Sequence, residues 1–172
     1  MPLHLHASLE IRAPAAGVFS LLSTPERLPQ WNTSVETARR AAPGEPIRLG
    51  SRAIMTGRLL GQPLESETEV VRFEPRHAFA TRAVRGPMLL TQFTLATQPY
   101  GCRVEVDVSG EVPGGRLGNK LAEGFLRTQL TASLERLRSL CEHEARQEAA
   151  SEAAPQGGDP ACWLHLTETH DD

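Results

Sequence analysis

Three glutamates on one predicted strand have the greatest capacity for chemistry in this sequence: Glu65, Glu67 and Glu69. Because side chains alternate along a strand, all three share one face. If Val71 and Phe73 point to the interior, Glu69 also points inward, and burial raises the pKa of its carboxyl to a value useful in proton transfer. If Val70 points inward instead, the three carboxylates are solvated and pair with arginines of neighbouring strands. The pattern favours the solvated arrangement, and the first one stays open.

Two further polar residues could point into an interior cavity, Arg82 and Gln92. Each lies in a β-rich run, so a shift of one residue in register moves it to the other face. An inward arginine or amide could polarise a carbonyl group, and an inward carboxylate could move a proton. The candidate catalytic residues are therefore Glu69, Arg82 and Gln92.

Histidines and cysteines offer little evidence for a metal site. His4 and His6 share a strand face and could chelate a metal if a neighbouring strand supplied a third ligand, but an exposed pair is the expected arrangement. The three cysteines, an odd number without C-x-x-C spacing, are expected to be reduced: Cys102, Cys141 and Cys162. No metal and no cofactor are expected.

The elements that would position these residues follow from hydrophobic periodicity. Residues 3–11 alternate between apolar and polar side chains, which predicts a strand. Pro14 and Pro25 suit the first turns of two short helices. Six further β-rich runs follow, at residues 34–41, 49–59, 63–73, 78–85, 88–97 and 102–112. Short turns with Pro or Gly separate them, so consecutive strands should be antiparallel neighbours.

One long helix is predicted over residues 115–144, because apolar residues recur at helical spacing and no proline interrupts them. At 1.5 Å per residue it is about 40 Å long, enough to cross a sheet. The composition then shifts to Ala, Glu, Gly and Asp. We expect one domain over residues 1–146 and a flexible tail over 147–172, in which Trp163 and Leu164 could dock.

Two stretches carry a resemblance to a known family. The first reads IRAPAAGVFSLL from Ile11 and continues as PERLPQWN to Asn32; the second reads VDVSGEVPGGRLGNKLA from Val106 and is followed by LERLRSLCE. Together they resemble the START-like superfamily, also called SRPBCC or Bet v 1-like, in its polyketide cyclase/dehydrase branch. The resemblance covers about residues 3–144. It implies an α+β helix-grip fold, with a seven-stranded antiparallel sheet wrapped around a long C-terminal helix and two short helices after strand one.

The resemblance also implies an apolar cavity between the sheet and the helix. Alternation along the strands and the helix then gives these expected lining residues: Trp31, Met55, Phe79, Met88, Phe93, Val106, Leu121 and Phe125. Pockets and cores are lined by the same residue types, so ordinary core packing is the competing interpretation of each of them.

Charge and hydropathy narrow the classes of partner. A net charge of −3 provides no basic surface for nucleic acid. No apolar stretch approaches the roughly 20 residues that span a bilayer, so we expect no integral membrane segment. We expect a cytoplasmic location. The first hypothesis is a carrier or sensor of a hydrophobic small molecule, lipid-like or polycyclic. A polyketide cyclase or dehydratase acting through Glu69 or Arg82 is the second. A protein-interaction module is the third, with no partner indicated.

Overall fold

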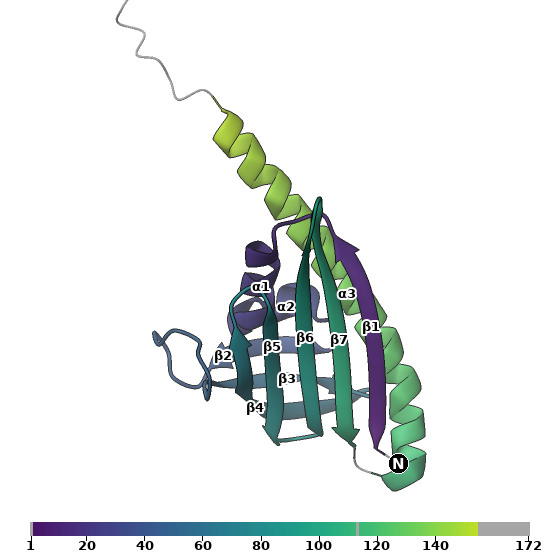
Figure 1. Ribbon diagram of the computed structural model, residues 1–172. Helices are drawn as coiled ribbons and strands as arrows, with labels where there is room; N and C mark the ends of the chain where they lie inside the picture. Colours follow the sequence, from purple (N-terminus) through teal and green to yellow (C-terminus); the bar gives the residue numbers. More distant parts are fainter. Residues whose placement is uncertain (1, 113, 155–172) are drawn as a thin grey trace, which may run out of the picture.

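A seven-stranded antiparallel sheet curves around one long helix in the computed structural model, which describes residues 2–112 and 114–154 (Figure 1). The elements are β1 (Leu3–Ile11), α1 (Ala15–Ser23), η1 (Pro25–Arg27), α2 (Leu28–Trp31), β2 (Val35–Arg40), β3 (Arg52–Leu59), β4 (Gln62–Glu74), β5 (Ala78–Arg85), β6 (Met88–Gln98), β7 (Gly101–Glu111) and α3 (Gly115–Ala153). The order of strands in the sheet is β1-β7-β6-β5-β4-β3-β2. The expected fold class is confirmed.

Strand β1 forms one edge of the sheet and lies next to β7, the last strand in the sequence. It pairs with β7 over its whole length, from Leu3 opposite Gly110 to Ile11 opposite Cys102. The apolar residues of both strands face the same side, where Leu5 and Val104 are almost completely buried. The alternation that predicted β1 from the sequence is thus the pattern of a sheet with one dry face.

The hydrophobic core lies between this part of the sheet, α1 and the C-terminal half of α3. Leu134, Leu137 and Cys141 of α3 are buried there, against residues of β1, β7 and α1. In the part of α3 that precedes Ser133, by contrast, Ala122 is the one buried residue among those described. The helix is therefore anchored through its second half, and its first half extends over the rest of the sheet.

A bulge in β4 decides which way its residues face. The pairing of β4 with β5 shifts between Val70, which lies opposite Thr81, and Arg72, which lies opposite Ala80. The extra residue lets both Val70 and Phe73 face the interior, although in a regular strand they would lie on opposite faces. Val70 is buried, and Phe73 packs edge-on against the rings of two other phenylalanines.

The glutamates of β4 lie on the outer face as a result. Glu65 pairs with Arg85 of β5, and Glu67 Oε1 lies 3.3 Å from Arg52 Nη1 of β3. Of the two arrangements open from the sequence, the structure has the solvated one. The expectation treated an inward Val70 and an inward Phe73 as exclusive, and this was wrong because of the bulge.

Helix α3 is longer than predicted. It ends at Ala153 rather than near Glu144, and its C-terminal turns project beyond the sheet (Figure 1). With 39 residues it is about 58 Å long. All side chains from Arg146 to Ala154 are exposed, so these turns stand free of the domain. The boundary at residue 146 stays a prediction, and Trp163 and Leu164 lie outside the described residues.

Candidate ligand-binding site

A cavity lies between the inner face of strands β3 to β6 on one side and residues of α2, β2 and α3 on the other. It has a larger lobe of about 210 Å³ and a smaller lobe of about 60 Å³. The two lobes adjoin, because four residues line both: Leu28, Met55, Thr68 and Thr81. We call the two lobes together the sheet cavity.

Most of the wall of the sheet cavity is apolar. Leu64, Ala83 and Leu89 come from the inner face of the sheet, and Leu126 comes from α3. The smaller lobe is bounded by Val70 and other apolar residues. Such a wall removes apolar surface of a ligand from water, which stabilises binding by about 25 cal/mol per Å².

Three threonines form a polar band across this wall, one on each of three adjacent strands. Thr81 of β5 lies directly opposite Thr91 of β6, and Thr68 of β4 is the diagonal neighbour of Thr81. Among the described residues these three hydroxyls have no hydrogen-bond partner. They are not fully buried either, because the one fully buried side-chain N or O atom without a partner in the described residues is Arg138 Nε. The hydroxyls are thus open to the cavity. We call Thr68, Thr81 and Thr91 the threonine row.

The charged residues of the cavity wall are two arginines, among the residues that the structure describes. Arg52 pairs with Glu67 as given above, and Arg58 Nε lies 3.0 Å from Glu36 Oε1. The side chains of both arginines are more than half exposed. They therefore belong to the rim of the cavity, and each already has a carboxylate partner.

The three candidate catalytic residues lie on the other side of the sheet. Glu69 and Arg82 are cross-strand partners on the outer face, and Gln92 lies opposite Asp107 there. Each is the immediate neighbour in sequence of one member of the threonine row, so alternation turns it away from the cavity. The expectation that they could point inward is corrected: the inner positions belong to the threonines.

The expected lining residues divide into three groups. Met55 and Phe79 lie on the cavity wall. Trp31, Phe93 and Val106 are buried in the core instead. Met88 and Leu121 are more than half exposed, and Phe125 is half-buried without lining the cavity.

Trp31 and Leu121 depart from the expected lining for local reasons. The indole of Trp31 packs edge-on against Phe93, with ring centroids 6.2 Å apart, and its Nε1 donates a hydrogen bond to the Leu21 carbonyl at 3.2 Å. A buried indole needs such a partner, which fixes Trp31 in the core. On α3, Leu126 faces the cavity, and Leu121 lies on a different side of the helix.

Sequence reasoning missed the threonine row, although a signal for it was present. Thr81 and Thr91 share the facing of Phe79 and Phe93, two residues away on the same strands, and these phenylalanines were expected to face inward. The same alternation therefore predicts inward threonines. Thr68 required the facing of Val70, which the sequence left open.

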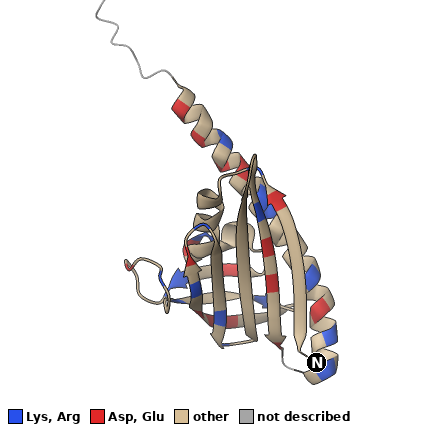
Figure 2. Ribbon diagram, viewed as in Figure 1, with Lys and Arg blue, Asp and Glu red and all other residues tan. Residues whose placement is uncertain are grey.

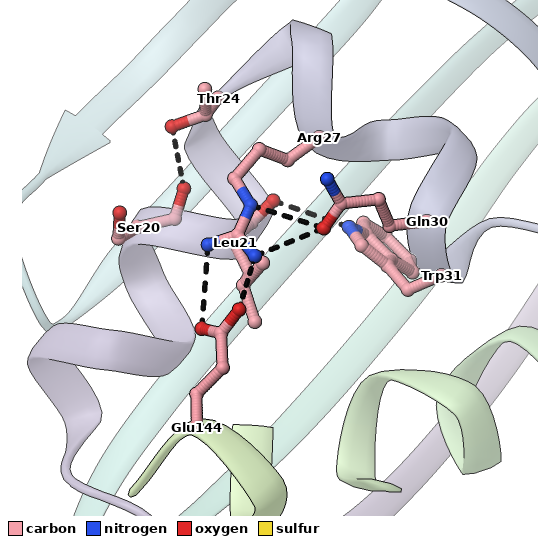
Figure 3. A network of polar contacts seen from close by, with 7 residues as sticks. All are labelled: Ser20, Leu21, Thr24, Arg27, Gln30, Trp31 and Glu144. Atoms are coloured by element: carbon pink, nitrogen blue, oxygen red, sulfur yellow. Dashed lines mark hydrogen bonds and ion pairs between the residues drawn. The ribbon is translucent and has the colours of Figure 1, made fainter. Parts of the chain in front are cut away.

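Polar contacts hold the short helices against α3 beside the cavity (Figure 3). Arg27 pairs with Glu144 through both terminal nitrogens, with Nη1 3.3 Å from Oε2, and its Nε donates to Gln30 Oε1 at 3.2 Å. Since Leu28 follows Arg27 and lines both lobes, the ion pair helps to position one wall of the sheet cavity.

A second contact joins the start of the β2 segment to α3. The backbone N–H of Thr33 donates to Ser133 Oγ at 3.0 Å, and the two hydroxyl oxygens lie 3.1 Å apart. Thr33 Oγ1 also bonds to Gln129 Oε1. These bonds hold the helix two turns beyond Leu126, so the two elements that close the cavity are fixed to each other.

The two histidines of β1 face solvent and share one carboxylate. His6 Nδ1 lies 2.9 Å from Asp107 Oδ1, and His4 Nε2 lies 3.7 Å from the same oxygen. The expected exposed pair is what the structure has. Within the described part of the chain, no group of three or more His, Cys, Asp or Glu side chains is arranged to hold a metal ion.

Two cysteines are free and buried, Cys102 and Cys141. Burial raises the pKa of the Cys141 thiol to about 12, and it raises the pKa of Cys102 as well. Such thiols are poor nucleophiles near neutral pH. They act as packing groups, and Cys162 lies outside the described residues.

A curved antiparallel sheet that grips one long C-terminal helix, with an apolar cavity between them, is the helix-grip fold. The chain belongs to the family described as polyketide cyclase / dehydrase and lipid transport, whose sequence profile matches residues 2–142. The expected family is thereby confirmed. It contains both binding proteins and enzymes by its own description, so the particular ligand or reaction does not follow from membership.

Solved structures share the fold at low sequence identity. A START superfamily protein from Mycobacterium smegmatis is 21% identical, with a TM-score of 0.63, and the match covers 84% of this chain and 98% of that one. Major latex-like protein 151 from Panax ginseng is 14% identical, with a TM-score of 0.66 and coverage of 82% and 98%. Protein NE0264 from Nitrosomonas europaea is 19% identical, with a TM-score of 0.65 and coverage of 86% and 97%.

No curated protein matches the chain. Among the described residues, no helix has both the length and the apolar character needed to cross a membrane.

Proposed function

We propose that this protein binds a hydrophobic small molecule in the sheet cavity, as a carrier or sensor. The observation that carries the proposal is the make-up of the cavity wall, in which apolar side chains surround a band of neutral hydroxyls. Apolar burial supplies the affinity of such a site, and a few polar groups set the orientation of the ligand.

The same wall favours binding over catalysis of the cyclase or dehydratase type. Such a reaction needs a group that gives or takes a proton near the bound carbonyl compound. Along the described wall the polar groups are hydroxyls, an amide and two arginines at the rim that are paired with glutamates. The carboxylates of β4 are on the far side of the sheet.

Native mass spectrometry of the purified protein, followed by denaturing extraction, tests the proposal directly. A co-purified lipid or polycyclic compound supports it and gives the ligand class. If the protein purifies without a ligand, its binding of the neutral fluorescent probe N-phenyl-1-naphthylamine is measured by titration instead. An empty protein that also leaves the probe unbound contradicts the proposal and favours a protein-interaction module.

A pair of matched substitutions on β6 shows whether the probe enters the sheet cavity. Thr91→Phe adds a ring to the larger lobe, and we expect it to weaken probe binding at least about tenfold, since the ring takes up volume that the ligand needs. Thr94→Phe places the same ring on the outer face of the same strand, and we expect unchanged affinity. Equal affinity in the two variants would place the probe outside the cavity.

A further inference from the structure

The threonine row indicates which ligands the sheet cavity selects. We propose that the cavity prefers uncharged ligands that carry hydroxyl or carbonyl oxygens along one face, and that it discriminates against ligands whose polar group is an anion such as a carboxylate. This inference rests on the proposed function, because it names the ligand class of the same cavity.

The placement of the hydroxyls suits a ligand that lies along the sheet. Directly opposed residues such as Thr81 and Thr91 have Cβ atoms about 5 Å apart, and a diagonal pair such as Thr68 and Thr81 about 7 to 8 Å. Phe79 and Phe93 flank Thr81 and Thr91 on one side. Oxygen atoms therefore occupy set positions on a wall that is mostly apolar.

Strand formation does not require these hydroxyls. Valine has nearly the same shape as threonine, and its branched Cβ suits a strand equally well. It would also bury better on an inward face. A hydroxyl on an apolar wall loses hydrogen bonds when a ligand displaces water, unless the ligand supplies an oxygen in return. Since a hydroxyl both donates and accepts, ligand hydroxyl and carbonyl oxygens both satisfy it.

The charges around the cavity disfavour an anion within it. A buried carboxylate needs a cation to offset its loss of hydration. The cations of the wall, Arg52 and Arg58, are at the rim and pair with Glu67 and Glu36. An anionic ligand would have to compete with these glutamates, and no lysine or histidine lines the cavity among the described residues.

Competition with N-phenyl-1-naphthylamine by two compounds of one ring system tests the role of the hydroxyls. We expect the wild-type protein to bind 2-naphthol about fivefold more tightly than naphthalene, the effect of one net hydrogen bond. Thr81→Val and Thr91→Val should each reduce this preference, and the double variant should abolish it, while the affinity for naphthalene stays unchanged. Thr94→Val, on the outer face of β6, should retain the preference in full.

A second pair of compounds tests the discrimination by charge. 2-Naphthamide and 2-naphthoate have nearly the same shape, and only the second is an anion at neutral pH. We expect the amide to bind at least about tenfold more tightly, because the cations of the described wall, Arg52 and Arg58, already have carboxylate partners.

Either of two results would overturn the inference while leaving the proposed function standing: naphthoate binding as well as the amide, or valine variants that keep the preference for 2-naphthol. An unchanged affinity for naphthalene shows that the valine variants are folded. If Thr81→Val does not fold, Thr91→Val alone is enough for the test. If the wild-type protein binds neither the fluorescent probe nor any of the four ring compounds, the proposed function fails and this inference fails with it.

Discussion

At the scale of single residues, burial decides what a reactive side chain in this protein can do. The carboxylates and arginines that could have served in catalysis lie on the solvated face of the sheet, where Glu65 and Glu67 pair with arginines of neighbouring strands. The thiols lie in the core, where the charged form is disfavoured. The polar side chains that line the cavity are mostly hydroxyls, which bind oxygen atoms but do not ionise.

The buried thiol of Cys141 predicts a loss of stability at alkaline pH. Burial, with smaller contributions from Cys102 and Glu144, raises its pKa from 9.0 to about 12. Between these values the unfolded chain releases the thiol proton and the folded chain keeps it, so the unfolded state binds fewer protons and stability falls as the pH rises. Urea unfolding across this range should show a shallower fall for Cys141→Ala than for the wild type. Parallel pH profiles would contradict the prediction.

At the scale of elements, ion pairs have different roles according to the parts they join. Positions of both charge signs are spread over the strands and α3 (Figure 2). Exposed pairs include Glu65 with Arg85 on the sheet and Glu123 with Arg127 on α3. The pair between Arg27 and Glu144 differs from these, because it joins the short helices to α3 and both side chains are about one third exposed. A contact between elements that is partly removed from water should contribute more to stability than a pair within one helix.

Removal of this contact should therefore destabilise the protein. We expect Arg27→Gln to lower the free energy of unfolding by about 1 to 2 kcal/mol, because Glu144 loses its partner and Gln30 loses a donor. Glu123→Gln breaks the exposed pair of Glu123 with Arg127 within α3. It should change the free energy of unfolding by less than about 0.5 kcal/mol. Chemical denaturation of both variants makes the comparison, and equal losses would show that Arg27 has no special role.

At the scale of the whole molecule, one half of α3 is anchored and the other half covers a cavity. The sheet around the first half of the helix is then free to hold a ligand, while the core around Leu134 and Leu137 maintains the fold. Beyond Ala145, which packs against the core, the helix has no buried residue in the part described. We therefore expect the domain to be complete before the helix ends.

Truncation tests this division of the chain. A protein that ends at Gln147 should keep the thermal midpoint and the probe affinity of the full chain, because the described residues it lacks are exposed. A protein that ends at Ser139 lacks Cys141 and Glu144 and should unfold at a much lower temperature. Thermal scans by circular dichroism measure both. A large loss in the longer protein would show that residues beyond Gln147, such as Trp163, dock on the domain.

Local patterns in the sequence determined the elements and their order. The period of two in β1 and the Pro and Gly turns between later strands are properties of neighbouring residues, and they placed all seven strands close to their observed bounds. The same applies to the helical spacing in α3. Its end was placed too early because the exposed turns after Ala145 have no apolar stripe to mark them.

Only the tertiary structure decided which face of each strand meets the cavity. In β4 a single extra residue at the bulge reversed the alternation, so that Val70 and Phe73 both face inward and the glutamates face outward. Whether an aromatic side chain belongs to the core or to the cavity depends on partners distant in sequence, as with Trp31 and Phe93. Facing and contact are properties of the assembled sheet and helix, and the local sequence does not contain them.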